Sequence, residues 1–259
     1  MDAPKLYLGT NLKMYKNNRE TLEYLSLLTA FTKDIDRSSL ELFVIPSFTS
    51  LADASRFVDH DRIRIGAQNM HWAESGQYTG EISPLMLKEL GIDIVELGHS
   101  ERRHVFGETD NLINLKALSA AEHGFTVLLC VGETADDKET GRADEVLASQ
   151  IATDLKGIEA YPESRLMVAY EPVWSIGVNG KPASPEYVSA RHETIRRVLM
   201  DTAGAKADAV PILYGGSVNG DNAESYLSLR NVDGLFIGRY AWDAERFSKL
   251  IRNLMYSAR

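Results

Sequence analysis

Eight short apolar segments run through the chain of 259 residues, and longer stretches separate them. The separating stretches include residues 111–123, 143–158 and 185–202, whose apolar side chains recur at helical spacing. Parallel strands joined by helices form an open doubly wound sheet or a closed barrel, and eight such units without a second domain favour the barrel. We therefore predict an α/β fold in which residues 1–259 form a single (β/α)8 barrel domain. The predicted strands cover residues 6–9, 42–45, 63–67, 92–97, 126–131, 167–170, 211–214 and 234–238.

The composition limits the possible partners and the cellular location. Hydrophobic residues make up 44% of the chain and charged residues 25%, as in ordinary globular proteins. A formal net charge of -9 argues against nucleic-acid binding and against adhesion to an anionic membrane. The sequence shows no apolar signal region at its start and no segment long enough to cross a membrane. We expect neither nucleic-acid nor membrane partners.

The sequence has a single cysteine, Cys130, within the apolar run 127–131. One cysteine excludes an internal disulfide framework and an all-cysteine metal site, and it suits a reducing cytoplasm. We interpret Cys130 as a core residue and expect a cytoplasmic protein.

One long connection, residues 68–81, shows no helical pattern. Loops of this length inside a compact domain are usually functional. It carries Met70, Trp72 and Tyr78, which we expect to be exposed. Because such side chains are enriched at protein interfaces, the loop is predicted to contact a second subunit.

Polar residues and glycines follow the predicted strands at the ends where a barrel carries its chemistry. The first strand leads to Asn11 and Lys13, the fourth to His99, the sixth to Glu171, the seventh to Gly215, Gly216 and Ser217, and the eighth to Gly238 and Arg239. Each has an ordinary alternative, since a lone lysine is often solvated, a lone histidine structural, and a glycine a turn residue. Their occurrence together at matching strand ends favours a catalytic site.

These residues resemble the triosephosphate isomerase family from Asn11-Leu12-Lys13 to the last helix. The matching segments, in family order, are residues 66–69, 78–81, 96–103, 131–133, 169–177 and 215–217. The resemblance implies a TIM barrel, no metal, no cofactor, and isomerisation of a short phosphorylated ketose through a cis-enediolate.

The family resemblance also implies roles for the four polar residues. Glu171 is the expected base, and His99 is the expected neutral imidazole that polarises the carbonyl, an assignment known from this family rather than deduced from the sequence. Lys13 and Asn11 are expected to stabilise the negative oxygens of the intermediate.

By the same resemblance, backbone N–H groups are expected to bind the phosphate under a mobile lid. The donors are Gly177, Gly215, Gly216, Ser217 and Gly238. The lid runs from Pro172 through Val173, Trp174, Ser175 and Ile176 to about residue 179, and Phe236 is expected to oppose Ile176. The other histidines that we considered, His71, His104, His123 and His192, lack metal-ligand spacing and are predicted to be structural or solvated. Thr79, with Gln68 and Asn69, is expected to form a homodimer contact near the partner's catalytic site.

Several positions depart from the common family pattern. Arg239 replaces a second glycine, Phe236 replaces leucine, and residues 69–72 and 178–180 are atypical. In the segments Gly-Arg-x-Ala-Trp (238–242) and Gln-Asn-Met-His-Trp (68–72), these departures resemble the L-erythrulose-1-phosphate isomerase branch of the family. The resemblance favours that tetrulose phosphate as substrate over the triose phosphates of glycolysis. Arg239 either contacts the phosphate, reshapes the wall beside the substrate, or turns outward into a surface salt bridge. A barrel that only binds a phosphorylated metabolite is the third, non-catalytic alternative.

Overall fold

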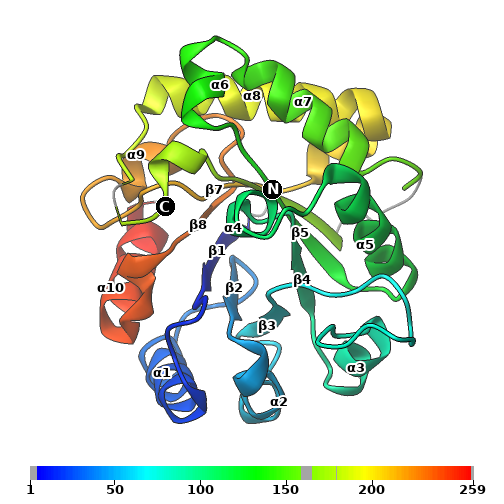
Figure 1. The fold of residues 1–259 in the computed structure, drawn as a ribbon. Helices are drawn as coiled ribbons and strands as arrows, with labels where there is room; N and C mark the ends of the chain where they lie inside the picture. Colours follow the sequence, from blue (N-terminus) through cyan, green and yellow to red (C-terminus); the bar gives the residue numbers. More distant parts are fainter. Residues whose placement is uncertain (1–4, 159–164, 179, 258–259) are drawn as a thin grey trace.

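The computed structural model describes residues 5–158, 165–178 and 180–257, which form a closed barrel of parallel strands inside a ring of helices (Figure 1). Each strand pairs with the next one along the chain, and β8 closes the barrel on β1, where Leu8 is opposite Leu235. The predicted (β/α)8 TIM barrel is therefore confirmed. The strands are β1 (Leu6–Asn11), β2 (Leu40–Ile45), β3 (Arg64–Ala67), β4 (Ile94–Leu97), β5 (Thr126–Val131), β6 (Leu166–Tyr170), β7 (Ile212–Tyr214) and β8 (Gly234–Phe236).

The helices follow the strands as the amphipathic stretches predict, with short helical turns added in the loops (Figure 1). The α-helices are α1 (Asn18–Phe31), α2 (Phe48–Phe57), α3 (Pro84–Glu89), α4 (Ser100–His104), α5 (Asp110–Glu122), α6 (Ala135–Glu139), α7 (Ala143–Asp154), α8 (Pro185–Ala203), α9 (Ala223–Leu227) and α10 (Ala244–Ser257). The 3-10 turns are η2 (Val173–Ser175), η3 (Gly204–Ala209) and η4 (Arg239–Trp242). Within the described ranges, we find no helix with both the length and the apolar character that a membrane span needs.

The apolar core has two layers. A large layer lies between strands and helices, and a smaller one fills the barrel with side chains such as Phe43, Ile94, Met167 and Phe236. Gly9 makes room for the Phe43 ring, because a Cβ there would lie 2.0 Å from Phe43 Cζ.

Alternation along β6 determines which side chains face the inside of the barrel. Met167 and Ala169 belong to the inner layer. Since side chains alternate across a strand, the next inward position after them is Glu171, directly beyond the end of β6. The pattern that fills the barrel therefore also aims this carboxylate at its mouth.

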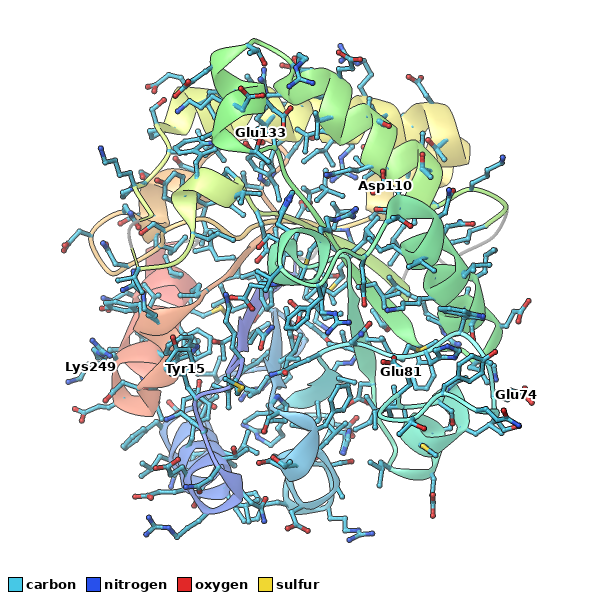
Figure 2. The ribbon with its side chains drawn as sticks, in the orientation of Figure 1. Tyr15, Glu74, Glu81, Asp110, Glu133 and Lys249 are labelled. Carbon is cyan, nitrogen blue, oxygen red and sulfur yellow. The ribbon has the colours of Figure 1, made fainter. Side chains whose placement is uncertain are left out.

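The loop of residues 68–81 is only partly exposed. Met70 is 1% exposed, so the expectation that its side chain projects into solvent is wrong. The loop folds back through a hydrogen bond from the His71 N–H to Ile82 O (2.8 Å), which turns Met70 into the core. Trp72 is half-buried, whereas Tyr78 is exposed as expected. Glu74 and Glu81 of this loop lie on the α3 side of the barrel (Figure 2).

Candidate active site

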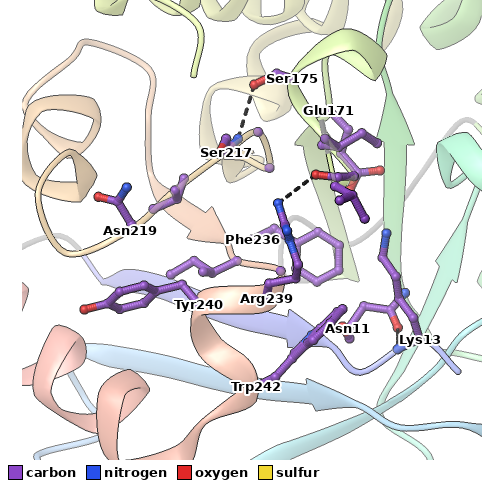
Figure 3. Close-up of a pocket in the computed structure, with 18 of the residues that line it drawn as sticks. Asn11, Lys13, Glu171, Ser175, Ser217, Asn219, Phe236, Arg239, Tyr240 and Trp242 are labelled. Atoms are coloured by element: carbon purple, nitrogen blue, oxygen red, sulfur yellow. Dashed lines mark hydrogen bonds between the residues drawn. The ribbon is translucent and has the colours of Figure 1, made fainter. Parts of the chain in front are cut away.

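A cavity of about 400 Å³ opens at the carboxyl ends of the strands (Figure 3). It brings together residues that lie far apart in the sequence. The predicted site residues that line it are Asn11, Lys13, His99, Glu171, Ser175, Ile176, Gly177, Gly215, Gly216, Ser217, Phe236, Gly238 and Arg239.

Glu171 is a buried carboxylate at the floor of this cavity. Its backbone N–H bonds to Val131 O (2.8 Å), and Gly132 permits the close approach because a Cβ there would lie 1.9 Å from Glu171 O. The residue is 5% exposed, and its Oε2 has no hydrogen-bond partner among the described residues. Burial raises the pKa of Glu171 to about 7, although the charge of Lys13 opposes the shift. The carboxylate is thus unusually basic and has a lone pair available.

His99 faces Glu171 as a neutral imidazole. It caps α4, where the Glu101 N–H donates to His99 Nδ1 (3.2 Å), so the ring hydrogen is assigned to Nε2. His99 Nε2 lies 3.6 Å from Glu171 Oε1. Burial, together with the positive charge of Lys13, lowers the pKa of His99 to about 3. A hydrogen-bond donor therefore stands beside the base without carrying a net charge.

Lys13 supplies a positive charge close to Glu171. Its Nζ donates to Glu101 Oε1 (2.7 Å), and its backbone has a φ of 51°, which is unusual for a residue with a side chain. Burial alone would lower the pKa of Lys13, but the Glu101 hydrogen bond and the charges of Glu171, Glu101 and Glu96 raise it above its usual value. The ammonium group stays charged at neutral pH.

Asn11 is held by four neighbours in the same region. Its Nδ2 donates to Glu96 Oε2 (2.7 Å), while its Oδ1 accepts from the Lys13 N–H (2.6 Å) and from Gln68 Nε2 (3.1 Å). Trp242 Nε1 donates to the backbone carbonyl of Asn11 (2.8 Å). These bonds fix the turn that carries Lys13.

Sequence reasoning assigned no role to Glu96, Glu101 or Trp242. The position of Glu96 could have been recognised from the sequence, because it is an acidic residue inside the apolar run of β4. A fully buried carboxylate needs a hydrogen-bond or charge partner. Burial and the nearby Glu171 raise the pKa of Glu96 well above its usual range. Glu101 and Trp242 reach the site only through three-dimensional folding, which sequence spacing does not reveal.

The backbone N–H groups that were expected to bind the phosphate differ in whether they already donate a hydrogen bond within the described structure. The Gly215 N–H bonds to Tyr170 O (2.8 Å) and continues the sheet, so the prediction that this N–H is a phosphate donor is wrong. The Ser217 N–H lies 3.2 Å from Ser175 Oγ and is thus shared with the lid. The N–H groups of Gly216 and Gly238 have no partner among the described residues and line the cavity.

The lid begins in an anchored segment. Trp174 Nε1 donates to Glu133 Oε1 (2.8 Å), and the Val173 N–H donates to Glu133 O (3.0 Å). Ser175 Oγ receives the Ser217 N–H, as Figure 3 shows. At the tip, Gly177 has a φ of 81°, a conformation that favours glycine. The expected lid end at residue 179 lies outside the described residues.

Arg239 extends from η4 across the mouth of the cavity (Figure 3). Its Nη2 donates to the carbonyl oxygen of Gly177 (2.8 Å). The alternative in which Arg239 forms a surface salt bridge is not what the structure shows, because no carboxylate among the described residues pairs with it. Phe236, which lines the same cavity, stacks on Phe43 with ring centroids 5.8 Å apart.

The remaining histidines have structural surroundings. His71 stacks between Trp72 and Tyr78, His192 Nδ1 bonds to Asn231 O (2.7 Å), and His123 Nδ1 bonds to Ser119 O (2.8 Å). Burial lowers the pKa of His192 to about 4 and lowers that of His104 as well.

The raised pKa of Glu171 predicts the pH dependence of turnover. A base must be unprotonated to accept a proton, so kcat/KM is expected to fall about tenfold per pH unit below pH 7. His99, with a pKa of about 3, adds no step between pH 5 and 9. Steady-state rates across this range test the prediction, after correction for the substrate phosphate, which itself ionises near pH 6. An acid limb centred near the ordinary pKa of a glutamate would contradict it.

Comparison with known proteins agrees with this geometry. The family model of triosephosphate isomerase matches residues 6–254. The chain is 46% identical over 248 residues to the L-erythrulose-1-phosphate isomerase of Rhizobium etli, a match that covers 95% of this chain and 91% of the relative. It is 45% identical over 247 residues to the protein of the same name from Mesorhizobium japonicum, with 95% of each chain covered. It is 43% identical over 255 residues to the protein of the same name from Rhizobium meliloti, with 98% of each chain covered. On the strength of the family match and the barrel, this chain belongs to the triosephosphate isomerase family.

Proposed function

We propose that this protein is a sugar-phosphate isomerase that interconverts L-erythrulose 1-phosphate and D-erythrulose 4-phosphate. The observation that carries the proposal is the pair of Glu171 and His99, a basic buried carboxylate 3.6 Å from an imidazole Nε2 that bears a hydrogen. Enolisation of a ketone needs a base beside a hydrogen-bond donor. The names of the relatives support the choice of a tetrulose phosphate as substrate.

The reaction follows from these two groups. In L-erythrulose 1-phosphate, carbon 2 carries the carbonyl and carbon 3 carries the acidic hydrogen. Glu171 removes the proton from carbon 3 while His99 Nε2 donates to the carbonyl oxygen. Return of the carbon-bound proton to carbon 2, with transfer of the hydroxyl proton between the oxygens by His99, places the carbonyl on carbon 3. Renumbered from the other end, this product is D-erythrulose 4-phosphate.

Lys13 and Asn11 serve the charged intermediate in this scheme. The ammonium group of Lys13 is proposed to face the enediolate oxygens, with Asn11 beside it. The Gly216 and Gly238 N–H groups, and that of Ser217 once Ser175 releases it, are proposed to bind the phosphate. Because the same groups would also act on dihydroxyacetone phosphate, the triose isomerisation is the alternative to be tested.

Substrate preference is expected to favour the four-carbon ketose. We expect kcat/KM for L-erythrulose 1-phosphate to exceed that for dihydroxyacetone phosphate by about tenfold or more, the usual selectivity for one extra carbon unit. Coupled assays on one enzyme preparation measure both values. A higher value for the triose phosphate would replace the proposed substrate, and no proton exchange from either compound in deuterated water would point to a binding protein.

We further propose a homodimer formed around the loop of residues 68–81. Gln68 Nε2 bonds to Lys13 O (2.8 Å) and Asn69 Nδ2 to Glu108 Oε1 (3.2 Å), so this loop joins two others that expose large apolar side chains. The exposed groups are Met14 (94%), Tyr15 (64%), Val105 (72%) and Phe106 (65%) on those loops, with Tyr78 (45%) on the loop itself. Exposed apolar side chains in such numbers are typical of an interface.

Light scattering is expected to give twice the mass of 28.8 kDa. Replacing Phe106 with Glu is expected to shift the protein toward monomer and to lower activity with it, because Thr79 is proposed to reach the partner's site. A fully active wild-type monomer would contradict the dimer. We propose a cytoplasmic location, which is supported by the single, buried cysteine of the chain.

A further inference from the structure

Arg239 donates a hydrogen bond from the mouth of the barrel to the tip of the predicted lid. Its Nη2 donates to Gly177 O (2.8 Å), a residue 62 positions away in the sequence. The same carbonyl accepts the Gly180 N–H at the longer distance of 3.3 Å. Val178, the next lid residue, is 76% exposed. The guanidinium group thus bridges η4, just beyond β8, and the tip of the predicted lid.

Arg239 forms no ion pair with any residue in the described ranges. No carboxylate among the described residues pairs with it, in contrast to Arg246 on the same rim, whose Nε lies 3.9 Å from Asp243 Oδ1. A guanidinium group has five N–H donors, and the bond to Gly177 uses one. In a chain with a net charge of -9, an uncompensated cation at the cavity mouth is suited to hold an anion.

Arg239 also follows Gly238 directly, and its side chain lines the same cavity as Gly216 and Ser217. An anion held by these backbone groups would therefore lie beside a cation that already contacts the lid. One group would then serve both the ligand and the lid.

We propose that Arg239 is a positioning residue that couples the lid to the phosphate of the substrate. In the loaded enzyme its guanidinium group donates to the phosphate oxygens and to Gly177 O at once, so that the closed lid is stable only while the dianion is present. This role rests on the proposed function, because it requires a phosphorylated substrate, and it goes beyond it by assigning how that substrate closes the site.

The role has a chemical consequence, because an enediolate phosphate decomposes when it is exposed. As the enediolate oxygen reforms a carbonyl at carbon 3, the electrons of the carbon 2–carbon 3 double bond shift to carbons 1 and 2. The carbon 1–oxygen bond breaks, and phosphate leaves with the bonding pair. The remaining enol gains a proton at carbon 1, loses its hydroxyl proton at carbon 2 to water, and becomes 1-hydroxybutane-2,3-dione. A lid that opens early should therefore release inorganic phosphate in place of isomerised product.

The first experiment compares Arg239→Gln and Arg239→Lys with wild type in isomerisation and phosphate release. For Arg239→Gln we expect KM to rise by about 10- to 100-fold, the range for a lost hydrogen bond to a charged group, with a smaller change in kcat. Phosphate released per turnover should rise at least about tenfold. Arg239→Lys should be intermediate, and added guanidinium ion should partly restore Arg239→Gln. Arg230→Gln, which removes an exposed charge on the turn before β8, is the control.

The second experiment needs no turnover. Hydrogen–deuterium exchange of the lid peptide is measured with and without inorganic phosphate, which should protect the lid in wild type and in Arg230→Gln but not in Arg239→Gln. If wild type isomerises neither substrate, the proposed function fails, and this measurement still decides the coupling. Wild-type phosphate release together with wild-type lid protection in Arg239→Gln would overturn the proposal. The proposal would also be overturned if Arg246→Gln changed KM, phosphate release and lid protection as much as Arg239→Gln does. Such a result would mean that any positive charge at the cavity mouth has this effect.

Discussion

Replacing Glu171 with Gln is expected to lower kcat by about 10²- to 10⁴-fold, the usual contribution of a positioned base. The amide has nearly the same shape as the carboxylate but cannot accept a proton from carbon. Glu171 is buried, and its Oε2 has no hydrogen-bond partner among the described residues that the substitution could remove. Because the amide is neutral, the variant adds no buried charge, and the barrel should still fold. Steady-state kinetics, with proton exchange in deuterated water, measure the loss in both directions of the reaction.

Two further variants make this result specific. Glu171→Asp withdraws the carboxylate by one methylene and should lose activity to an intermediate degree, because a misplaced base still accepts protons. Glu139→Gln, on the exposed surface of α6, should behave as wild type. A Glu171→Gln enzyme within a few-fold of wild type would remove Glu171 from the role of base.

Replacing Lys13 with Met is the second substitution with a large expected effect. Loss of the ammonium group should lower kcat by about 10²- to 10³-fold, because the proposed positive charge facing the enediolate oxygens is then missing. It should also move the acid limb of the pH profile upward, since the charge of Lys13 lowers the pKa of Glu171. Kinetic pH profiles of wild type and variant measure both effects.

A shift in the acid limb of the pH–activity profile distinguishes a local electrostatic effect of Lys13 from misfolding of the variant. A misfolded site would lose activity without moving the apparent pKa of the base. Lys33→Met, which removes an exposed charge at the end of α1, provides the control and should leave both rate and limb unchanged. A limb that stays near pH 7 in Lys13→Met would mean that Lys13 does not act on Glu171.

Much of the architecture was accessible from the sequence because strand alternation and helical periodicity are local signals. The ends of the predicted strands mattered most, since parallel strands in a closed barrel bring their carboxyl ends to one mouth. Asn11, Lys13, His99 and Glu171 could therefore be grouped before any coordinates were known. The structure brings these four together in one cavity.

The sequence failed where the outcome depends on individual backbone hydrogen bonds. Gly215 was expected to present its N–H to a phosphate, but that group continues the sheet toward Tyr170. Met70 was expected in solvent, but the bond from His71 to Ile82 draws the loop inward. Periodicity does not encode such choices, because both arrangements use the same residues with the same spacing.

The bond from Trp242 to Asn11 has a consequence for synthesis of the chain. Asn11 and Lys13 leave the ribosome well before Trp242, because the indole that holds their turn is encoded 231 positions after Asn11. The strand β8, which pairs with β1, is also synthesised late. The hydroxyl of Tyr24 likewise donates its hydrogen bond to the carbonyl oxygen of Ala241 (2.7 Å), which is synthesised late as well. Nascent chains that end before η4 should therefore carry all four proposed catalytic side chains and remain inactive, so that catalysis starts only after η4 has been synthesised.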